Sequence, residues 1–158
     1  MQPAGCLGRG GAVAIVVVML GCAVLSRSGA ATMPGGPPPE YARIWLYRDY
    51  QPYVSLARPY VRFNGRIVGI SEPGGAFFRD VMPGGYEITV DSQGHDVNQF
   101  AHATVVAGQQ IYVEVDALRL SNCAGARRGS CRPTFYTLLR PPEIAASAMA
   151  NSAFHGGK

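Results

Sequence analysis

His95, Asp96 and His102 are the only grouping of metal-ligand type in this sequence of 158 residues. Two imidazoles and a carboxylate could hold zinc, but no closing ligand follows at a recognised spacing. We therefore interpret them as solvated residues in and beside a polar loop. No serine lies in a nucleophile-elbow motif, so hydrolase chemistry has no support either. The sequence predicts a protein that is not an enzyme and holds no metal and no cofactor.

Cys123 and Cys131 could form a covalent cross-link. They flank a short loop of Gly, Ala, Arg and Ser residues between two strand-like runs. Their spacing fits neither a CxxC redox motif nor a zinc knuckle. In an oxidising compartment we expect a structural disulfide, and closing a loop of this length would stabilise the fold by roughly 2.5 kcal/mol.

An aromatic and basic stripe is the candidate binding surface. Its residues alternate along the first predicted strand: Tyr41, Arg43, Trp45 and Tyr47. Tyr, Trp and Arg are enriched at interfaces, and aromatic side chains also form sugar-binding platforms. The alternative is that the loop at residues 49–59 covers the stripe, in which case it is not a binding surface.

The charge pattern argues against a nucleic-acid partner. The formal net charge is +4, but the basic residues are scattered and Arg127-Arg128 is the only adjacent pair. A nucleic-acid-binding surface would be expected to cluster them on one face.

Apolar and polar residues alternate along short runs, and Gly, Pro and Asn turns lie between these runs. This pattern is typical of a β-sandwich or barrel. The predicted strands are residues 42–47, 60–63, 66–68, 77–81, 86–90, 101–106, 111–115 and 134–139. Asn64-Gly65 predicts a two-residue type I′ hairpin, since both residues tolerate positive φ. Pro83-Gly84-Gly85 predicts a turn that places Asp80 and Glu87 on adjacent strands.

The N-terminus has the pattern of an export signal. Residues 11–25 are uncharged and apolar, and Arg9 precedes them. Two processing routes stay open. Cys22 follows Leu20-Gly21 as in a lipobox, although Met19 stands where leucine is usual. Cleavage after Ala30 is the other route. The Pro/Gly-rich residues 31–40 then read as an extended spacer.

The run Gly75 to Val90 looks like a segment shared by transthyretin-like and carboxypeptidase-regulatory-like β-sandwiches. Together with residues 44–48 and 61–69, it resembles the domain-of-unknown-function family twenty-eight forty-six. Members of that family are bacterial envelope domains, often on lipoproteins. The resemblance implies a small antiparallel sandwich and an envelope location, and it implies no activity.

Four segments follow from these patterns. We expect an export segment at 1–30, a linker at 31–40, a sandwich of seven or eight strands at 41–141, and a mobile or weakly helical tail at 142–158. The predicted function is that of a non-enzymatic protein of the bacterial cell envelope. It would be periplasmic and held to the membrane by a lipid anchor or an uncleaved signal. It would act as a structural or protein-interaction domain with an envelope protein as partner. The alternative is a glycan- or peptide-binding module that uses the aromatic stripe, and a metal-dependent enzyme is a more distant third.

Overall fold

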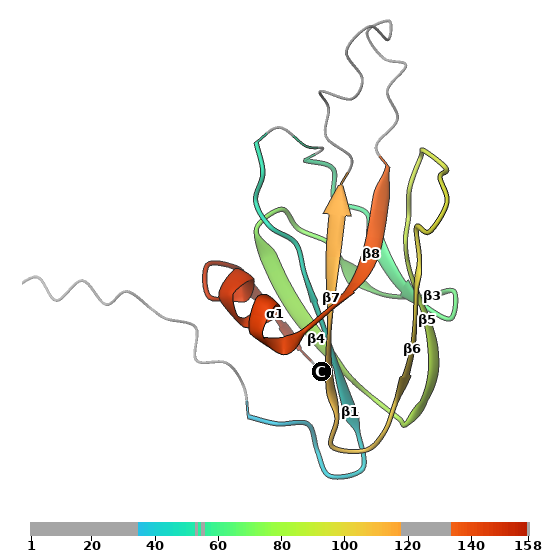
Figure 1. Ribbon diagram of the computed structural model, residues 1–158, viewed down its shortest axis with the longest axis vertical. Helices are drawn as coiled ribbons and strands as arrows, with labels where there is room; N and C mark the ends of the chain where they lie inside the picture. The colour runs from blue at the N-terminus through green and yellow to red at the C-terminus, as the bar shows by residue number, and fades with distance from the viewer. Residues whose placement is uncertain (1–34, 53, 55, 118–133, 158) are drawn as a thin grey trace, which may run out of the picture.

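The computed structural model describes residues 35–52, 54, 56–117 and 134–157, which fold as two β-sheets packed face to face (Figure 1). The five-stranded sheet has the order β8-β7-β1-β4-β9 and the four-stranded sheet the order β3-β2-β5-β6. The first sheet contains β1 (Ala42–Tyr47), β4 (Gly75–Val81), β7 (Gln110–Ala117), β8 (Phe135–Arg140) and β9 (Ala153–Gly157). The second contains β2 (Tyr60–Phe63), β3 (Arg66–Ile70), β5 (Gly84–Val90) and β6 (Ala101–Val105).

The predicted all-β sandwich is confirmed, with two differences in detail. The described chain forms nine strands instead of seven or eight, because β9 comes from the C-terminal tail. Most neighbouring strands are antiparallel, but β1 pairs in parallel with β7 and β4 pairs in parallel with β9.

The β2–β3 hairpin forms as its turn residues predict. Asn64 and Gly65 have φ angles of 48° and 80°, the positive values that a type I′ turn needs. The Asn64 side chain also fastens the hairpin to β5, since its Oδ1 accepts the Glu87 backbone N–H at 2.8 Å and its Nδ2 donates to the Gly85 carbonyl at 3.2 Å.

The connection after β4 differs from its prediction. Pro83-Gly84-Gly85 does not join neighbouring strands, because β4 pairs with β1 and β9 whereas β5 pairs with β2 and β6. The chain crosses here from one sheet to the other. Asp80 and Glu87 therefore lie on different sheets, and the local sequence could not distinguish this crossing from a hairpin.

The main core lies between the sheets and is built from the inward-facing residues of strands in both sheets. Its largest contributors are buried aliphatic and aromatic side chains: Ile44, Leu46, Val61, Phe63, Phe77, Ile88, Val113, Val115 and Phe135. At one lateral edge β8 is fastened to the opposite sheet. The Thr137 hydroxyl donates to the Ile88 carbonyl at 2.8 Å, and the Thr137 backbone N–H donates to the Gln99 carbonyl at 3.2 Å.

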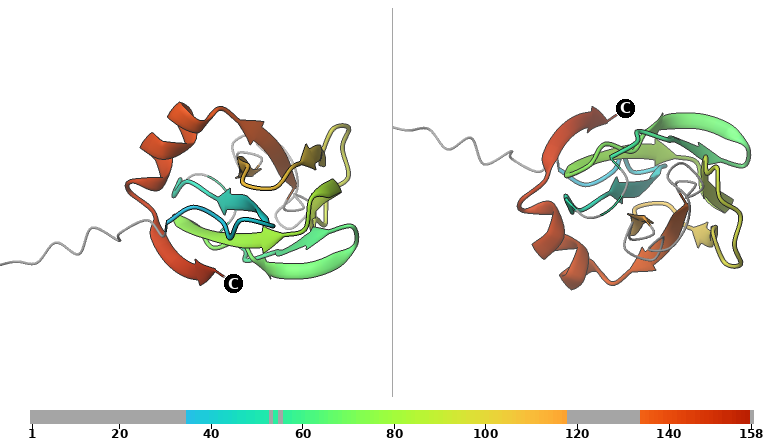
Figure 2. Two further views of the ribbon diagram at one scale, coloured as in Figure 1. Left: turned by 90° about the horizontal axis from the view of Figure 1, so that it is seen from below. Right: turned by 90° about the horizontal axis from the view of Figure 1, so that it is seen from above.

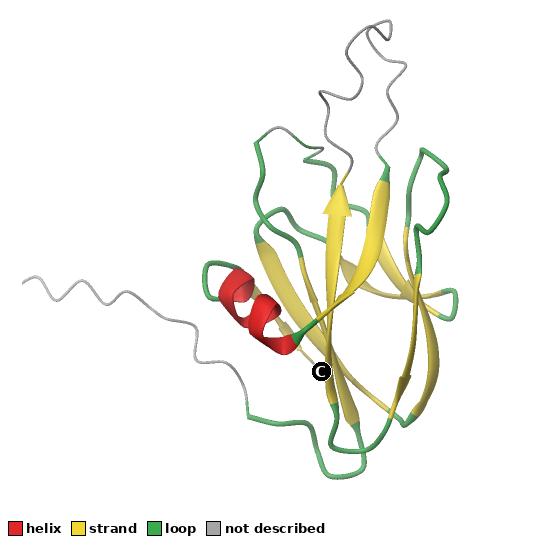
Figure 3. Ribbon diagram, in the orientation of Figure 1, coloured by secondary structure: helices red, strands yellow, loops and turns green. Residues whose placement is uncertain are grey.

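The tail, which the sequence predicts to be mobile or weakly helical, contains a short helix and, beyond that prediction, a strand. The tail forms α1 (Pro142–Met149) and then β9 (Figure 3). Ala145 and Met149 lie four residues apart on one face of α1, and both are buried. The Ala153 backbone N–H donates to the Gly74 carbonyl at 2.8 Å, where β9 begins to follow β4. The sequence gives little sign of this packing, because α1 is short and buries only one residue per turn.

In both views of Figure 2, α1 (red) lies on the side of the molecule opposite β3 (pale green). The helix covers the outer face of the five-stranded sheet, where it contacts β7.

Candidate functional site

The predicted aromatic stripe is not an exposed surface. Trp45 and Tyr47 are each only 2% exposed and Arg43 is 4% exposed, whereas Tyr41 at the start of the stripe is 38% exposed. The interpretation of these four residues as one binding platform is therefore wrong. The cover is α1 together with the Phe154 side chain, not the chain at residues 49–59. Helix α1 packs on the outer face of the sheet, and β9, which carries Phe154, extends the sheet beside β4.

The covered face is a second, smaller hydrophobic cluster. The Trp45 ring lies 4.9 Å from the Phe78 ring, and the Phe154 ring from β9 lies 6.1 Å from Trp45 and 5.8 Å from Phe78, measured between centroids. The Trp45 indole N–H donates to the Gln110 side-chain oxygen at 2.9 Å. The polar atom of Trp45 is therefore satisfied within the fold, as a structural role requires.

Arg43 forms a buried ion pair with Asp80, its register partner on β4. Its Nε and Nη2 donate to the two carboxylate oxygens at 2.7 and 2.9 Å, and its guanidinium carbon lies 3.7 Å from the Phe78 ring centroid. Its Nη1 also donates to the Gly35 carbonyl. The same side chain thus joins β1, β4 and the linker that precedes the sandwich.

The Tyr47 hydroxyl in this cluster has a strongly raised pKa. Its hydroxyl is buried and makes no hydrogen bond within the described part of the chain. Burial, with a smaller contribution from Glu114, raises the pKa of Tyr47 to about 12, and Arg140 opposes the shift. The phenol is therefore kept neutral, which suits packing better than acid–base chemistry near neutral pH.

Arg48 is a further buried cation, which the sequence reading did not single out. Its Nη1 donates to the Ala57 carbonyl at 2.8 Å, and its guanidinium carbon lies 5.0 Å from the Phe135 ring centroid. Burial lowers the pKa of Arg48, and Asp116 and Glu72 oppose that shift. Its position directly after the alternating aromatic residues of β1 is the one feature of the sequence that could have indicated its burial.

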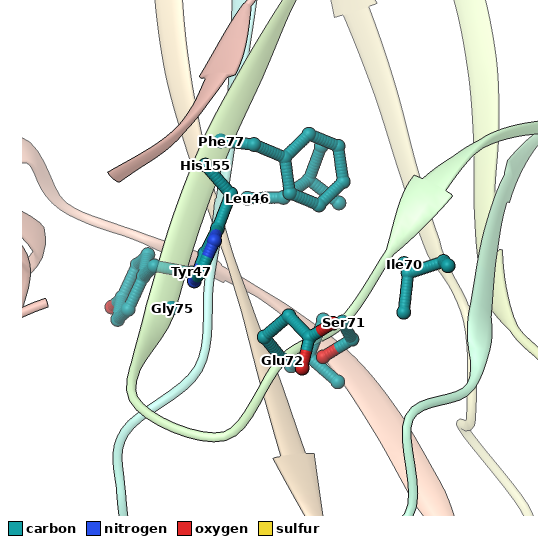
Figure 4. A pocket seen from close by; sticks show the side chains of 9 residues that line it. Leu46, Tyr47, Ile70, Ser71, Glu72, Gly75, Phe77 and His155 are labelled. Carbon is teal, nitrogen blue, oxygen red and sulfur yellow. The ribbon is translucent and has the colours of Figure 1, made fainter. Parts of the chain in front are cut away.

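A narrow gap lies at the start of β4, lined by Ser71, Glu72 and His155 among others (Figure 4). It is too narrow to admit a water molecule. A Cβ on Gly75 would lie 2.8 Å from His155 Cδ2 and 2.9 Å from Glu72 Cβ, so only glycine fits here. The Glu72 carboxylate forms an ion pair with Arg58, whose Nε lies 2.6 Å from Glu72 Oε2. The gap is a close packing contact and offers no room for a ligand.

The metal-type residues are placed separately in the loop and on β6. Asp96 accepts the Tyr136 hydroxyl at 2.7 Å, and this hydrogen bond lowers the pKa of Asp96. His102 on β6 lies with its ring 5.2 Å from the Phe100 ring. The described residues contain no group of three or more His, Cys, Asp or Glu side chains that could hold a metal ion.

Three predicted site residues lie outside the described residues: Cys22, Cys123 and Cys131. The lipidation site and the disulfide therefore stay predictions. Within residues 35–157, as far as they are described, no helix has both the length and the apolar character needed to cross a membrane.

One end of the sandwich carries an open hollow. It has a volume of about 280 Å³ and is lined by the chain before β2, the chain after β5 and the start of β8. Tyr60, which is 47% exposed, forms part of its wall. Ser92 and Phe135 also line it, and the Phe135 backbone N–H donates to the Ser92 hydroxyl at 3.0 Å. This loop-bearing end lies at the top of Figure 1.

No protein-family model matches the sequence, and no curated protein matches it with significant similarity. The resemblance to family twenty-eight forty-six is therefore a prediction from its motifs.

Proposed function

We propose that this protein is an exported, membrane-tethered β-sandwich of the bacterial envelope that works by contact and without catalysis. One observation carries the proposal. The chain enters the sandwich through residues 35–41 at one end, and the loops that line the hollow lie at the other end (Figure 1). A tether at the first end holds the second end away from the membrane, where a partner protein can reach it.

Other features support the same function. Residues 11–25 have the composition of an export segment, and Cys22 and Ala30 offer two processing sites. The motifs shared with family twenty-eight forty-six support an envelope location. The buried, hydrogen-bonded state of Trp45 and the neutral Tyr47 phenol support a scaffold role for the polar and aromatic residues of β1.

Intact-mass analysis of the protein purified from its native membrane fraction tests the tether. A diacylglycerol-modified N-terminus at Cys22 is the expected result, and cleavage after Ala30 with recovery outside the cytoplasm would keep export but remove the anchor. An unprocessed chain recovered from the cytoplasm would overturn the proposal.

A photo-crosslinking amino acid tests which end contacts a partner. Placed at Tyr60 it should capture one protein reproducibly in intact cells, whereas the same probe at Ile144, which is 52% exposed on α1, should not. Equal capture at both positions would contradict a contact made by the loop-bearing end.

A further inference from the structure

The end of the sandwich where the chain enters is formed by three segments: residues 35–41, 82–84 and 106–109 (bottom of Figure 1). The Gly108 backbone N–H donates to the Tyr41 carbonyl at 2.8 Å, which joins the first and third segments. The pairing of Ala42 with Val81, continued by one residue, brings Tyr41 opposite Met82. The second and third segments therefore both adjoin Tyr41.

The same end is apolar and exposed. Tyr41, Met82 and Val106 are 38%, 58% and 61% exposed, although their neighbours Ala42 and Val105 are buried in the core. Pro83 and Ala107 are exposed beside them. We call these five residues the apolar tip: Tyr41, Met82, Pro83, Val106 and Ala107.

Charge is nearly absent from this end. Glu40 is the one charged residue in the three segments. Arg43, directly behind the tip, is neutralised by its two hydrogen bonds to Asp80. The loop-bearing end differs, because the chain after β5 carries Asp91, His95 and Asp96. Exposed apolar side chains that cluster without charged neighbours are typical of a protein- or membrane-interaction site.

We propose that the apolar tip rests in the interfacial layer of a phospholipid bilayer. This inference rests on the proposed function, since it takes the membrane tether as given. Tyrosine is enriched at the headgroup level of membranes, with its ring in apolar surroundings and its hydroxyl in water. Met82, Pro83 and Val106 supply apolar side chains that can enter the acyl boundary beside it.

The tether makes this weak contact effective. Between Cys22 and Tyr41 lie eighteen residues, which span at most about 60 Å when fully extended. Such a short linker keeps the tip at a high local concentration near the lipid, so a few apolar side chains suffice to hold it there. The chain enters the sandwich at the tip, where the Tyr41 carbonyl accepts the Gly108 N–H, and Gly35 lies beside Arg43 a short way behind it. The linker is therefore long enough for the tip to reach the surface that carries the anchor.

Lipid-quenching of a tryptophan tests the contact in the full chain. The chain is reconstituted in phosphatidylcholine–phosphatidylglycerol vesicles, with or without phosphatidylcholine brominated near the headgroup end of its acyl chains. Val106→Trp reports on the tip, and Val97→Trp, at a position 76% exposed in the loop between β5 and β6, is the matched control. Wild-type protein gives the background of Trp45, which is buried.

We expect bromine to cause about a twofold loss of the added fluorescence in Val106→Trp and little loss in Val97→Trp. Ala107→Trp serves as a second tip variant, checked for folding by circular dichroism. If the chain floats with the vesicles and neither tip variant is quenched more than the control, the tip contact is wrong and the tether stands. If the chain does not float with the vesicles, the proposed membrane tether fails, and the tip contact with it.

Discussion

Arg43 and Asp80 illustrate how a single residue pair ties separate parts of the chain together. Their side chains are 5% and 15% exposed, and the guanidinium has two hydrogen bonds to the carboxylate and a position over the Phe78 ring. Removing one partner of such a pair leaves the other charge buried and unpaired, which is costly. The pair therefore has a large effect on stability.

Asp80→Ala should lower the free energy of unfolding by about 3 kcal/mol, because Arg43 then keeps its charge in a buried site without its carboxylate. Urea denaturation at neutral pH measures the change. Asp91→Ala is the control, because it breaks the solvent-exposed pair with Arg62, 2.7 Å in length, and should leave stability nearly unchanged. Equal effects of the two substitutions would contradict the structural role of Arg43.

Tyr47 gives a pH dependence whose sign follows from its shifted pKa. The ordinary phenol pKa is 10.0 and the folded protein raises it to about 12, so the folded state holds the proton to higher pH. Between these values the unfolded state binds fewer protons, and stability falls as the pH rises. Below pH 10 the group has no effect on the pH dependence.

Tyr47→Phe should therefore show a smaller loss of stability from about pH 9 to about pH 11 than the wild type. At neutral pH it should be no less stable, since the lost hydroxyl has no hydrogen bond in the described structure. Tyr50→Phe, at a position 64% exposed, should keep the wild-type pH dependence. Tyr136, whose pKa is also raised, contributes a fall of the same sign in all three proteins. Urea denaturation at both pH values measures the loss of stability for each protein. An equal loss in Tyr47→Phe and Tyr50→Phe would contradict the raised pKa of Tyr47.

At the scale of elements, α1 and β9 determine whether the aromatic face is a surface or a core. Strand β1 is buried at every position, because one face meets the main core and the other meets the tail. The covering elements are short, and they hold by close fit: a Cβ on Gly157 would lie 2.2 Å from the Phe78 ring. A change that displaces α1 should therefore expose Trp45.

Ala145→Arg places a long charged side chain where Ala145 is 0% exposed, and it should destabilise the protein by about 2 kcal/mol or more. Trp45 emission should shift to longer wavelength, and acrylamide should quench it more strongly. Ala146→Arg makes the same change one residue along, on the exposed side of α1, and should leave both measurements as in the wild type. An unchanged Trp45 signal in Ala145→Arg would show that α1 does not cover the face.

At the scale of the whole molecule, β1 links the two hydrophobic clusters. Ile44 and Leu46 point into the main core while Trp45 and Tyr47 point into the smaller one. Thr137 fastens the five-stranded sheet to the four-stranded sheet through the Ile88 carbonyl. Neither cluster can lose β1 without disturbing the other, so the sandwich should unfold as one unit.

Urea unfolding followed by Trp45 fluorescence and by far-ultraviolet circular dichroism should give coincident transitions with one midpoint. The fluorescence reports on the smaller cluster and the dichroism on both sheets. A fluorescence midpoint at clearly lower urea would mean that the tail and its cluster unfold separately from the rest.

Much of this arrangement follows from sequence alone, because the signals are local. Alternation along residues 42–47 and 111–115 marks strands whichever sheet they join. The positive φ angles at Asn64 and Gly65 follow from the residue types themselves. The export signal is also local, since it depends on the composition of residues 11–25. Export and the envelope function both stay predictions.

Tertiary structure decided what lies against each face. Alternation on β1 separates Ile44 and Leu46 from Trp45 and Tyr47, but it cannot tell whether the second face meets water or another part of the chain. That depended on α1 and β9, more than ninety residues further on, whose small residues carry little hydrophobic pattern. For the same reason Trp45 and Tyr47, which the alternation predicts on a binding surface, lie in a core. The apolar tip likewise depends on tertiary structure, because strand register brings Tyr41, Met82 and Val106 to one end.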